Sequence, residues 1–119
     1  MSLLLALAAA AAPAPAMPEA FHGEWAPSAA ACADKYAKRI VTGPMNTEGD
    51  YWGVVKAVDV VDARHIVVRE GDDDFGVLLT ADYSLGSDGK TLTLRILDRN
   101  GSKMPEAPIP MVRCEVPHG

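Results

Sequence analysis

This sequence of 119 residues has little of what most metal and redox sites are built from. Its only two cysteines, Cys32 and Cys114, are too far apart to form a C-x-x-C redox motif. Its three histidines, His22, His65 and His118, do not lie at metal-ligand spacing from another histidine or from a cysteine. The sequence therefore predicts no metal ion and no cofactor.

The motifs of common enzyme classes are missing as well. There is no glycine-rich phosphate loop, and Ser87 stands in a Gly-Ser-Asp-Gly turn rather than in a G-x-S-x-G nucleophile elbow. The three consecutive aspartates at 72–74 lack the alternating ligands, the glycine and the distal glutamate of a calcium-binding EF-hand loop. We therefore expect a protein that is not an enzyme.

Positive charge is also in short supply. The formal net charge is −5 and the isoelectric point is about 5.0. Because an acidic chain has no attraction for phosphate backbones, nucleic-acid binding is disfavoured, and a basic ligand or protein is the better electrostatic match. The chain also lacks the run of about 20 apolar residues that a membrane-spanning helix needs, so it is not expected to span a membrane.

The start of the chain is typical of a processing signal. An apolar stretch at 3–12 is followed by small residues with the A-x-A pattern at Ala14 and Ala16. This pattern predicts a signal peptide over residues 1–16 and a single domain over residues 17–119. We therefore expect the mature protein in the periplasm or in the secreted fraction, with an alanine-rich tail as the alternative interpretation.

The two cysteines flank the part of the sequence that reads as folded. A bond between Cys32 and Cys114 would join the first folded segment to the last, and such bonds persist in oxidising compartments outside the cytosol. The alternative is a pair of free, buried thiols in a cytosolic protein.

Short β-strands dominate the predicted secondary structure. Valine-rich or alternating segments at 51–61, 65–70, 75–81, 91–97 and 109–116 are separated by turn-forming residues, and a further strand is expected over 36–42. Residues 43–50 are expected to form a loop, and Ser28 to begin one short helical turn. Lys56 interrupts an otherwise apolar face of the segment 51–61, which indicates a bulge near Gly53 or Ala57. The predicted fold is all-β: a small antiparallel meander that closes into a barrel or half-barrel, with one disulfide.

A G-x-W motif opens the folded part. Trp25 is expected to plug one end of the core, and Gly23 permits a close approach of the backbone or a positive φ. Together with Cys32, the valine-rich meander and Val112-Arg113-Cys114, this motif resembles small exported bacterial β-barrel proteins that are mostly uncharacterised, and its opening is similar to that of lipocalins. The resemblance to lipocalins implies a β-barrel in which Arg113 packs over Trp25 through a cation–π contact.

Two functions from different classes follow. The first is a binding protein for a small apolar ligand or peptide, with a cavity lined by Trp52, Val54, Phe75, Leu79 and Leu94. The second is an inhibitor or interaction protein that presents an acidic loop, formed by Glu70, Asp72, Asp73 and Asp74, to a basic envelope or lytic enzyme.

Overall fold

The computed structural model describes residues 14–104 and 107–115. The predicted signal peptide lies outside these residues except for its last three positions, and His118 lies outside them too. Met17, which follows the predicted peptide, is buried, and its backbone N–H donates to the carbonyl oxygen of Gly43 at 2.7 Å. Met17 is therefore part of the folded body.

The described residues form nine antiparallel strands and three short 3₁₀ helices. The strands are β1 (Gly23–Ala26), β2 (Arg39–Val41), β3 (Met45–Glu48), β4 (Tyr51–Asp62), β5 (His65–Asp72), β6 (Val77–Leu85), β7 (Thr91–Arg99), β8 (Ser102–Lys103) and β9 (Ile109–Arg113). The 3₁₀ helices are η1 (Glu19–Phe21), η2 (Ala30–Ala33) and η3 (Asp73–Phe75).

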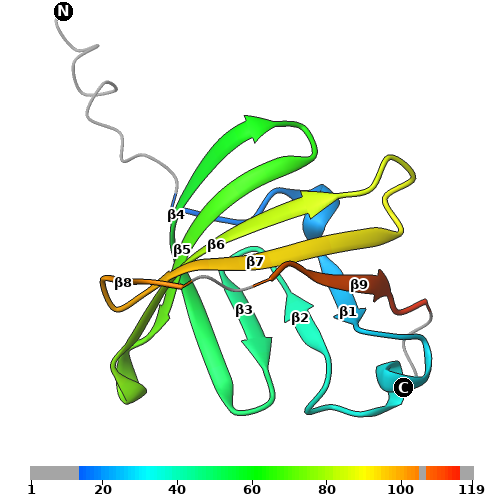
Figure 1. Ribbon diagram of the computed structural model, residues 1–119, viewed down its shortest axis with the longest axis horizontal. Helices are drawn as coiled ribbons and strands as arrows, with labels where there is room; N and C mark the ends of the chain where they lie inside the picture. Colours follow the sequence, from blue (N-terminus) through cyan, green and yellow to red (C-terminus); the bar gives the residue numbers. More distant parts are fainter. Residues whose placement is uncertain (1–13, 105–106, 116–119) are drawn as a thin grey trace, which may run out of the picture.

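The strands close into a barrel (Figure 1). Neighbours follow the order β6-β5-β4-β3-β2-β1-β9-β7, and β7 pairs with β6 to complete the ring, while β8 only extends the end of β7. The predicted all-β barrel is thus confirmed. Closure matters because an open sheet would expose the unpaired backbone groups of its two edge strands.

Two local predictions were wrong. Residues 45–48, expected to lie in a loop, form β3, which pairs with both β2 and β4. Phe75, expected to begin a strand, lies in η3 instead, so β6 starts at Val77. The carboxylate of Asp72 explains the second result because it accepts a hydrogen bond from the backbone N–H of Asp74 and caps η3.

The predicted bulge in β4 is confirmed. The pairing between β4 and β5 shifts register between Val55 and Ala57, so that no residue of β5 lies opposite Lys56 in the sheet. The inward-facing positions of β4 are therefore odd-numbered before the bulge and even-numbered after it. Val55 points into the barrel before the bulge and Val58 packs against the core after it, whereas Trp52 and Val54 point outward.

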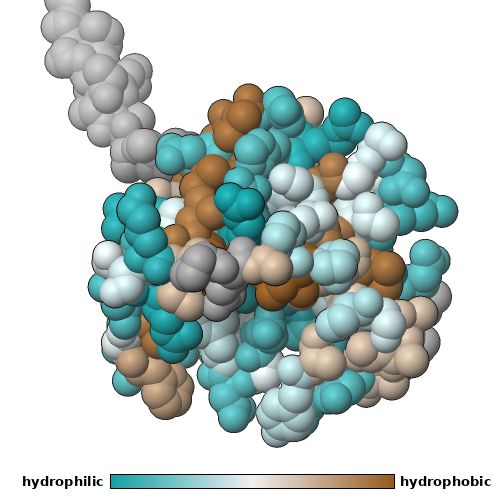
Figure 2. Space-filling view, in the orientation of Figure 1, coloured by the Kyte–Doolittle hydropathy of each residue, from teal (hydrophilic) through white to brown (hydrophobic). Residues whose placement is uncertain are grey.

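A hydrophobic cluster forms the core of the barrel. It contains Met17, Phe21, Trp25, Val41, Val55, Ile66, Val68, Ala81, Tyr83, Leu92, Leu94 and Met111, none of them more than 5% exposed. Seven of the eight strands of the ring contribute to it, since each supplies alternate residues to the interior. The outer surface is mixed, and Figure 2 shows hydrophilic and hydrophobic residues interspersed on the face that it presents.

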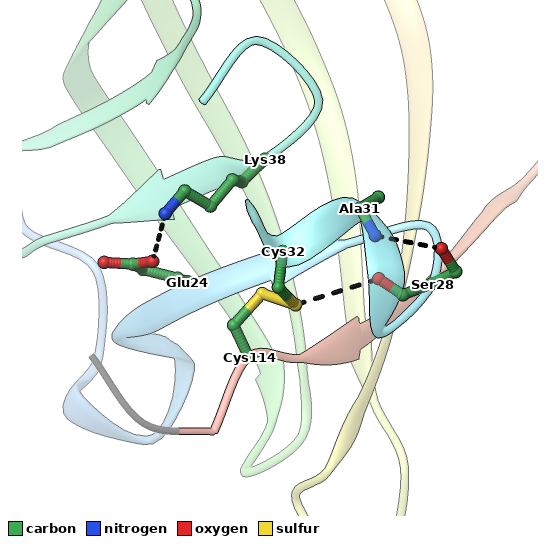
Figure 3. Close-up of a disulfide and its surroundings, with 6 residues drawn as sticks. All are labelled: Glu24, Ser28, Ala31, Cys32, Lys38 and Cys114. Atoms are coloured by element: carbon green, nitrogen blue, oxygen red, sulfur yellow. Dashed lines mark hydrogen bonds and ion pairs between the residues drawn. A yellow bond between two sulfur atoms is a disulfide. The ribbon is translucent and has the colours of Figure 1, made fainter. Parts of the chain in front are cut away.

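The predicted disulfide between Cys32 and Cys114 is present. Figure 3 shows that it joins η2 to the segment just after β9, next to the Glu24–Lys38 ion pair that links β1 to the residue before β2. The two cysteines are 82 residues apart in the sequence. In the chain-entropy model a loop of that length corresponds to about 4 kcal/mol of stabilisation. The bond reinforces the junction of β1 and β9, where only two residue pairs are in register.

Candidate functional site

One end of the barrel is closed by Trp25 and Arg113. Trp25 is fully buried, and its indole N–H donates to the carbonyl oxygen of Phe21 at 3.0 Å. The guanidinium of Arg113 stacks on the indole, with its central carbon 4.2 Å from the ring centroid. The predicted cation–π contact between these two residues is therefore present.

Backbone carbonyls hold Arg113 in this position. Its guanidinium donates to the carbonyl oxygens of Gly89 at 3.0 Å, His22 at 2.6 Å and Ala20 at 3.1 Å. Gly23 has a φ of 136°, and a Cβ at this position would collide with the guanidinium. The glycine of the G-x-W motif therefore makes room for the arginine, which covers Trp25 at this end.

The opposite end of the barrel contains a cavity of about 590 Å³. Its apolar lining residues come from the start of β6, from β7 and from η3, with Met104 just after β8 and Ile109 at the start of β9. Its apolar lining consists of Phe75, Val77, Leu79, Leu94, Ile96, Met104 and Ile109, and its polar lining of Arg39, Glu48, Asp50, Tyr51, Asp72 and Arg99. The volume falls within the range of about 300–1,000 Å³ that is usual for small-molecule sites.

A buried carboxylate lies beneath the polar side of this cavity. Glu70 is completely buried and accepts four hydrogen bonds. The four donors are Arg39 Nη1 at 3.0 Å, Asn46 Nδ2 at 2.9 Å, Tyr51 Oη at 2.8 Å and Tyr83 Oη at 2.5 Å. Such complete pairing is what allows a charged group to remain in the interior.

The network shifts the pKa values of its members. Burial, followed by the charge of Glu70, raises the pKa of Tyr51 above its ordinary value, and burial raises that of Tyr83. Burial alone would lower the pKa of Arg39, but the negative charges of Glu70 and Glu48 and the hydrogen bond to Glu70 outweigh this effect, so the pKa is raised. Arg39 therefore stays charged and both tyrosines stay neutral at physiological pH.

Gly53 is the backbone position that makes the network possible. Gly53 pairs with Asn46 across β3 and β4, and a Cβ there would collide with the ring of Tyr51, whose nearest carbons would be 2.7 Å away. The ring of Tyr51 therefore lies across the glycine, and this position brings its hydroxyl to Glu70.

The structure brings together three of the five residues expected to contact a ligand. Phe75, Leu79 and Leu94 line the cavity, with Phe75 at its solvent-exposed rim. Trp52 and Val54 do not line it: they are 59% and 40% exposed on the outer face of β4. Their placement follows from the bulge, which separates their face from that of Val58.

Only two of the four residues of the predicted acidic loop are exposed. Glu70 and Asp72 are buried, and both carboxylates are occupied by hydrogen bonds within the barrel. Asp73 and Asp74 are exposed, and Asp73 pairs with Lys56 at 3.3 Å. Only two of the four acidic side chains of this loop are therefore exposed on its surface, and one of these two forms an ion pair.

Sequence reasoning missed the polar members of the site, although a signal for them exists. Glu70 has the same strand parity as the buried residues Ile66 and Val68, and Arg39 has the same parity as Val41. A charged residue in phase with core residues has to be either paired inside or at the end of its strand. Since the predicted strand ends at Glu70, that rule makes Glu70 a candidate for the interior without deciding between the two positions.

No group of three or more histidine, cysteine, aspartate or glutamate side chains that could hold a metal ion is found within residues 14–104 and 107–115. In the same part of the chain, no helix is long and apolar enough to cross a membrane. Comparisons with protein-family models, with curated proteins and with solved structures found no match.

Proposed function

We propose that this protein is an exported, non-enzymatic β-barrel that binds a small apolar ligand in the cavity at its open end. The observation that carries this proposal is the cavity itself, which has seven apolar lining residues around about 590 Å³. Burial of an apolar surface against such a lining contributes about 25 cal/mol per Å². A lining of this kind, in which five of the six polar residues come from the chain between β2 and β5, suits a molecule with an apolar body.

The state of Glu70 supports a binding role over a catalytic one. A general base has to be able to reach a proton of the substrate, whereas both oxygens of Glu70 are already occupied by donors from the barrel. The same burial removes Glu70 and Asp72 from an acidic contact surface, so we do not pursue the inhibitor hypothesis.

Export is part of the proposal. The disulfide supports it because such bonds persist in oxidising compartments. We also keep the similarity to lipocalins within the proposal, supported by the stacking of Arg113 on Trp25. Expression of the whole chain in a bacterium, followed by fractionation and intact-mass measurement, tests export. A periplasmic product that starts near Met17 and carries the disulfide is expected, whereas a full-length cytosolic product with two free thiols would contradict export.

Titration with an environment-sensitive apolar fluorophore tests ligand binding. The disulfide-bonded protein is expected to bind one probe per chain. Val77→Trp places a large side chain in the cavity lining and is expected to abolish binding, whereas Val60→Trp, on the outer face of β4 at 64% exposure, should leave binding intact. Equal binding by both variants would show that the probe binds elsewhere, and no binding by the wild type would refute the function.

A further inference from the structure

Arg39 leaves part of its guanidinium unused at the wall of the cavity. It is 4% exposed, and its Nε donates to Glu48 while its Nη1 donates to Glu70 and Tyr83. Its Nη2 donates no hydrogen bond to any residue within the described part of the chain, although Arg39 lines the cavity. Nη2 can therefore donate a hydrogen bond to a group that occupies the cavity.

The surrounding charges oppose an anion as that group. Two carboxylates, those of Glu48 and Glu70, lie within 3.1 Å of the guanidinium of Arg39 and offset its charge. Asp50 and Asp72 also line the cavity, where Arg99 is the other cationic residue. A carboxylate near Arg39 would thus face more negative than positive charge, and an ammonium group would lie directly against the guanidinium.

Glu48 provides an acceptor beside this donor. Its Oε1 accepts from Arg39 Nε at 3.1 Å, and its Oε2 accepts no hydrogen bond from any residue in the described ranges. Its side chain is 40% exposed and belongs to the cavity lining. The cavity therefore presents a donor and an acceptor side by side on its polar side.

The carboxylates around Arg39 oppose an anion, and its guanidinium opposes a cation placed against it. A neighbouring donor and acceptor in this setting match the carbonyl and N–H of an amide. Building on the proposed function, we propose that the ligand of this cavity is an uncharged amphiphile with an amide head. Its carbonyl oxygen accepts from Arg39 Nη2 and its N–H donates to Glu48, while its apolar chain packs against residues such as Leu79, Leu94 and Ile96.

A matched series of probes tests this assignment. Decanamide, decanol, decanoate and decylamine share one apolar chain and differ in the head group. Isothermal titration of the disulfide-bonded protein at pH 7 is expected to give decanamide the highest affinity, about tenfold above decanoate and decylamine, with decanol between them. Equal affinities, or tighter binding of decanoate or decylamine, would overturn the amide assignment.

The variant Glu48→Gln tests whether the head group of the ligand binds beside Glu48. Removal of this charge is expected to raise the affinity for decanoate about fivefold and to leave that for decanamide nearly unchanged, since glutamine keeps a carbonyl acceptor. Asp59→Asn, an equal loss of charge on the exposed outer face of β4, should change neither affinity. If Glu48→Gln behaves like Asp59→Asn, the head-group site is not at Glu48.

The series separates this inference from the function on which it rests. If none of the four probes binds, the proposed function and the inference both fail. If decanol binds and Val77→Trp prevents its binding, but the head groups are not discriminated, only the amide assignment fails.

Discussion

The two ends of this barrel are built from the same strands, but side chains fill only one of them. At the closed end Trp25 occupies the interior, and Arg113 covers it while donating to three backbone carbonyls. At the open end the strands carry medium-sized apolar residues, among them Leu79 and Leu94, and a cavity of about 590 Å³ remains.

The difference teaches which features of the sequence set the internal space. An aromatic side chain and the glycine that lets an arginine cover it are sufficient to close one end. Between the two ends, the network around Glu70 spans β2, β3, β4, β5 and β6 through hydrogen bonds and forms a polar floor for the cavity. The closed end and the floor are therefore expected to account for stability, and the open end for binding.

The sharpest test of this comparison truncates one aromatic residue at each end. Trp25→Ala removes a fully buried ring, its hydrogen bond to Phe21 and its contact with Arg113, and should cost about 4 kcal/mol of the free energy of unfolding. Phe75→Ala truncates a ring that is 71% exposed at the cavity rim and should cost less than about 0.5 kcal/mol. Urea unfolding followed by circular dichroism measures both values.

Phe75→Ala has a second expected result. Because Phe75 lines the cavity, the variant should bind the apolar probe more weakly while it unfolds like the wild type. If Trp25→Ala unfolds at the same urea concentration as the wild type, or if Phe75→Ala causes a large loss of stability, the two ends do not have the separate roles proposed for them.

The floor between the two ends is tested by Glu70→Gln. The amide NH₂ group would face donors that now point at a carboxylate oxygen, and Arg39 would keep only Glu48 as a charged partner. Leaving a buried charge without its partner costs about 3 kcal/mol or more. Glu24→Gln is the matched control, because the Glu24–Lys38 pair is partly exposed and should be worth under about 1 kcal/mol. Equal unfolding midpoints for the two variants would show that the floor does not stabilise the barrel.

Much of the closed end could be predicted from the sequence, because its signals are local or involve rare residues. Gly23 and Trp25 stand in one short motif, and the two cysteines are the only ones in the chain. The disulfide and the stacking of Arg113 on Trp25 were both expected and are both present.

The open end was harder to predict because its geometry depends on strand register. The bulge at Lys56 moves Trp52 and Val54 to the outside, a result that hydrophobicity alone does not predict since β4 is apolar on both faces. The strand β3 was missed because Met45-Asn46-Thr47-Glu48 lacks apolar alternation: its buried position holds Asn46, which is paired with Glu70 rather than with the apolar core. A partner 24 residues away cannot be recognised from a local pattern.

The floor is also expected to cause a loss of stability at alkaline pH. The pKa values of Tyr51 and Tyr83 are raised in the folded protein, by burial first and by Glu70 as well, above an ordinary value of 10.0. As the pH rises through 10, unfolded chains lose these protons while folded chains keep them, so the stabilisation is complete below that pH and is lost above it. Tyr83 is expected to contribute about 1 kcal/mol per pH unit, and the partly exposed Tyr51 less because solvent screens its surroundings.

Urea unfolding at a series of pH values from 8 to 11, with phenolate absorbance recorded in parallel, measures this loss. Tyr83→Phe should lower stability at pH 8, because the hydroxyl no longer donates to Glu70, and should reduce the slope above pH 10. Full ionisation of all three tyrosines near pH 10 in a protein that keeps its native circular dichroism would show that solvent reaches the floor from the cavity. In that case the polar side of the open end would be better described as part of a water-filled mouth than as a sealed wall.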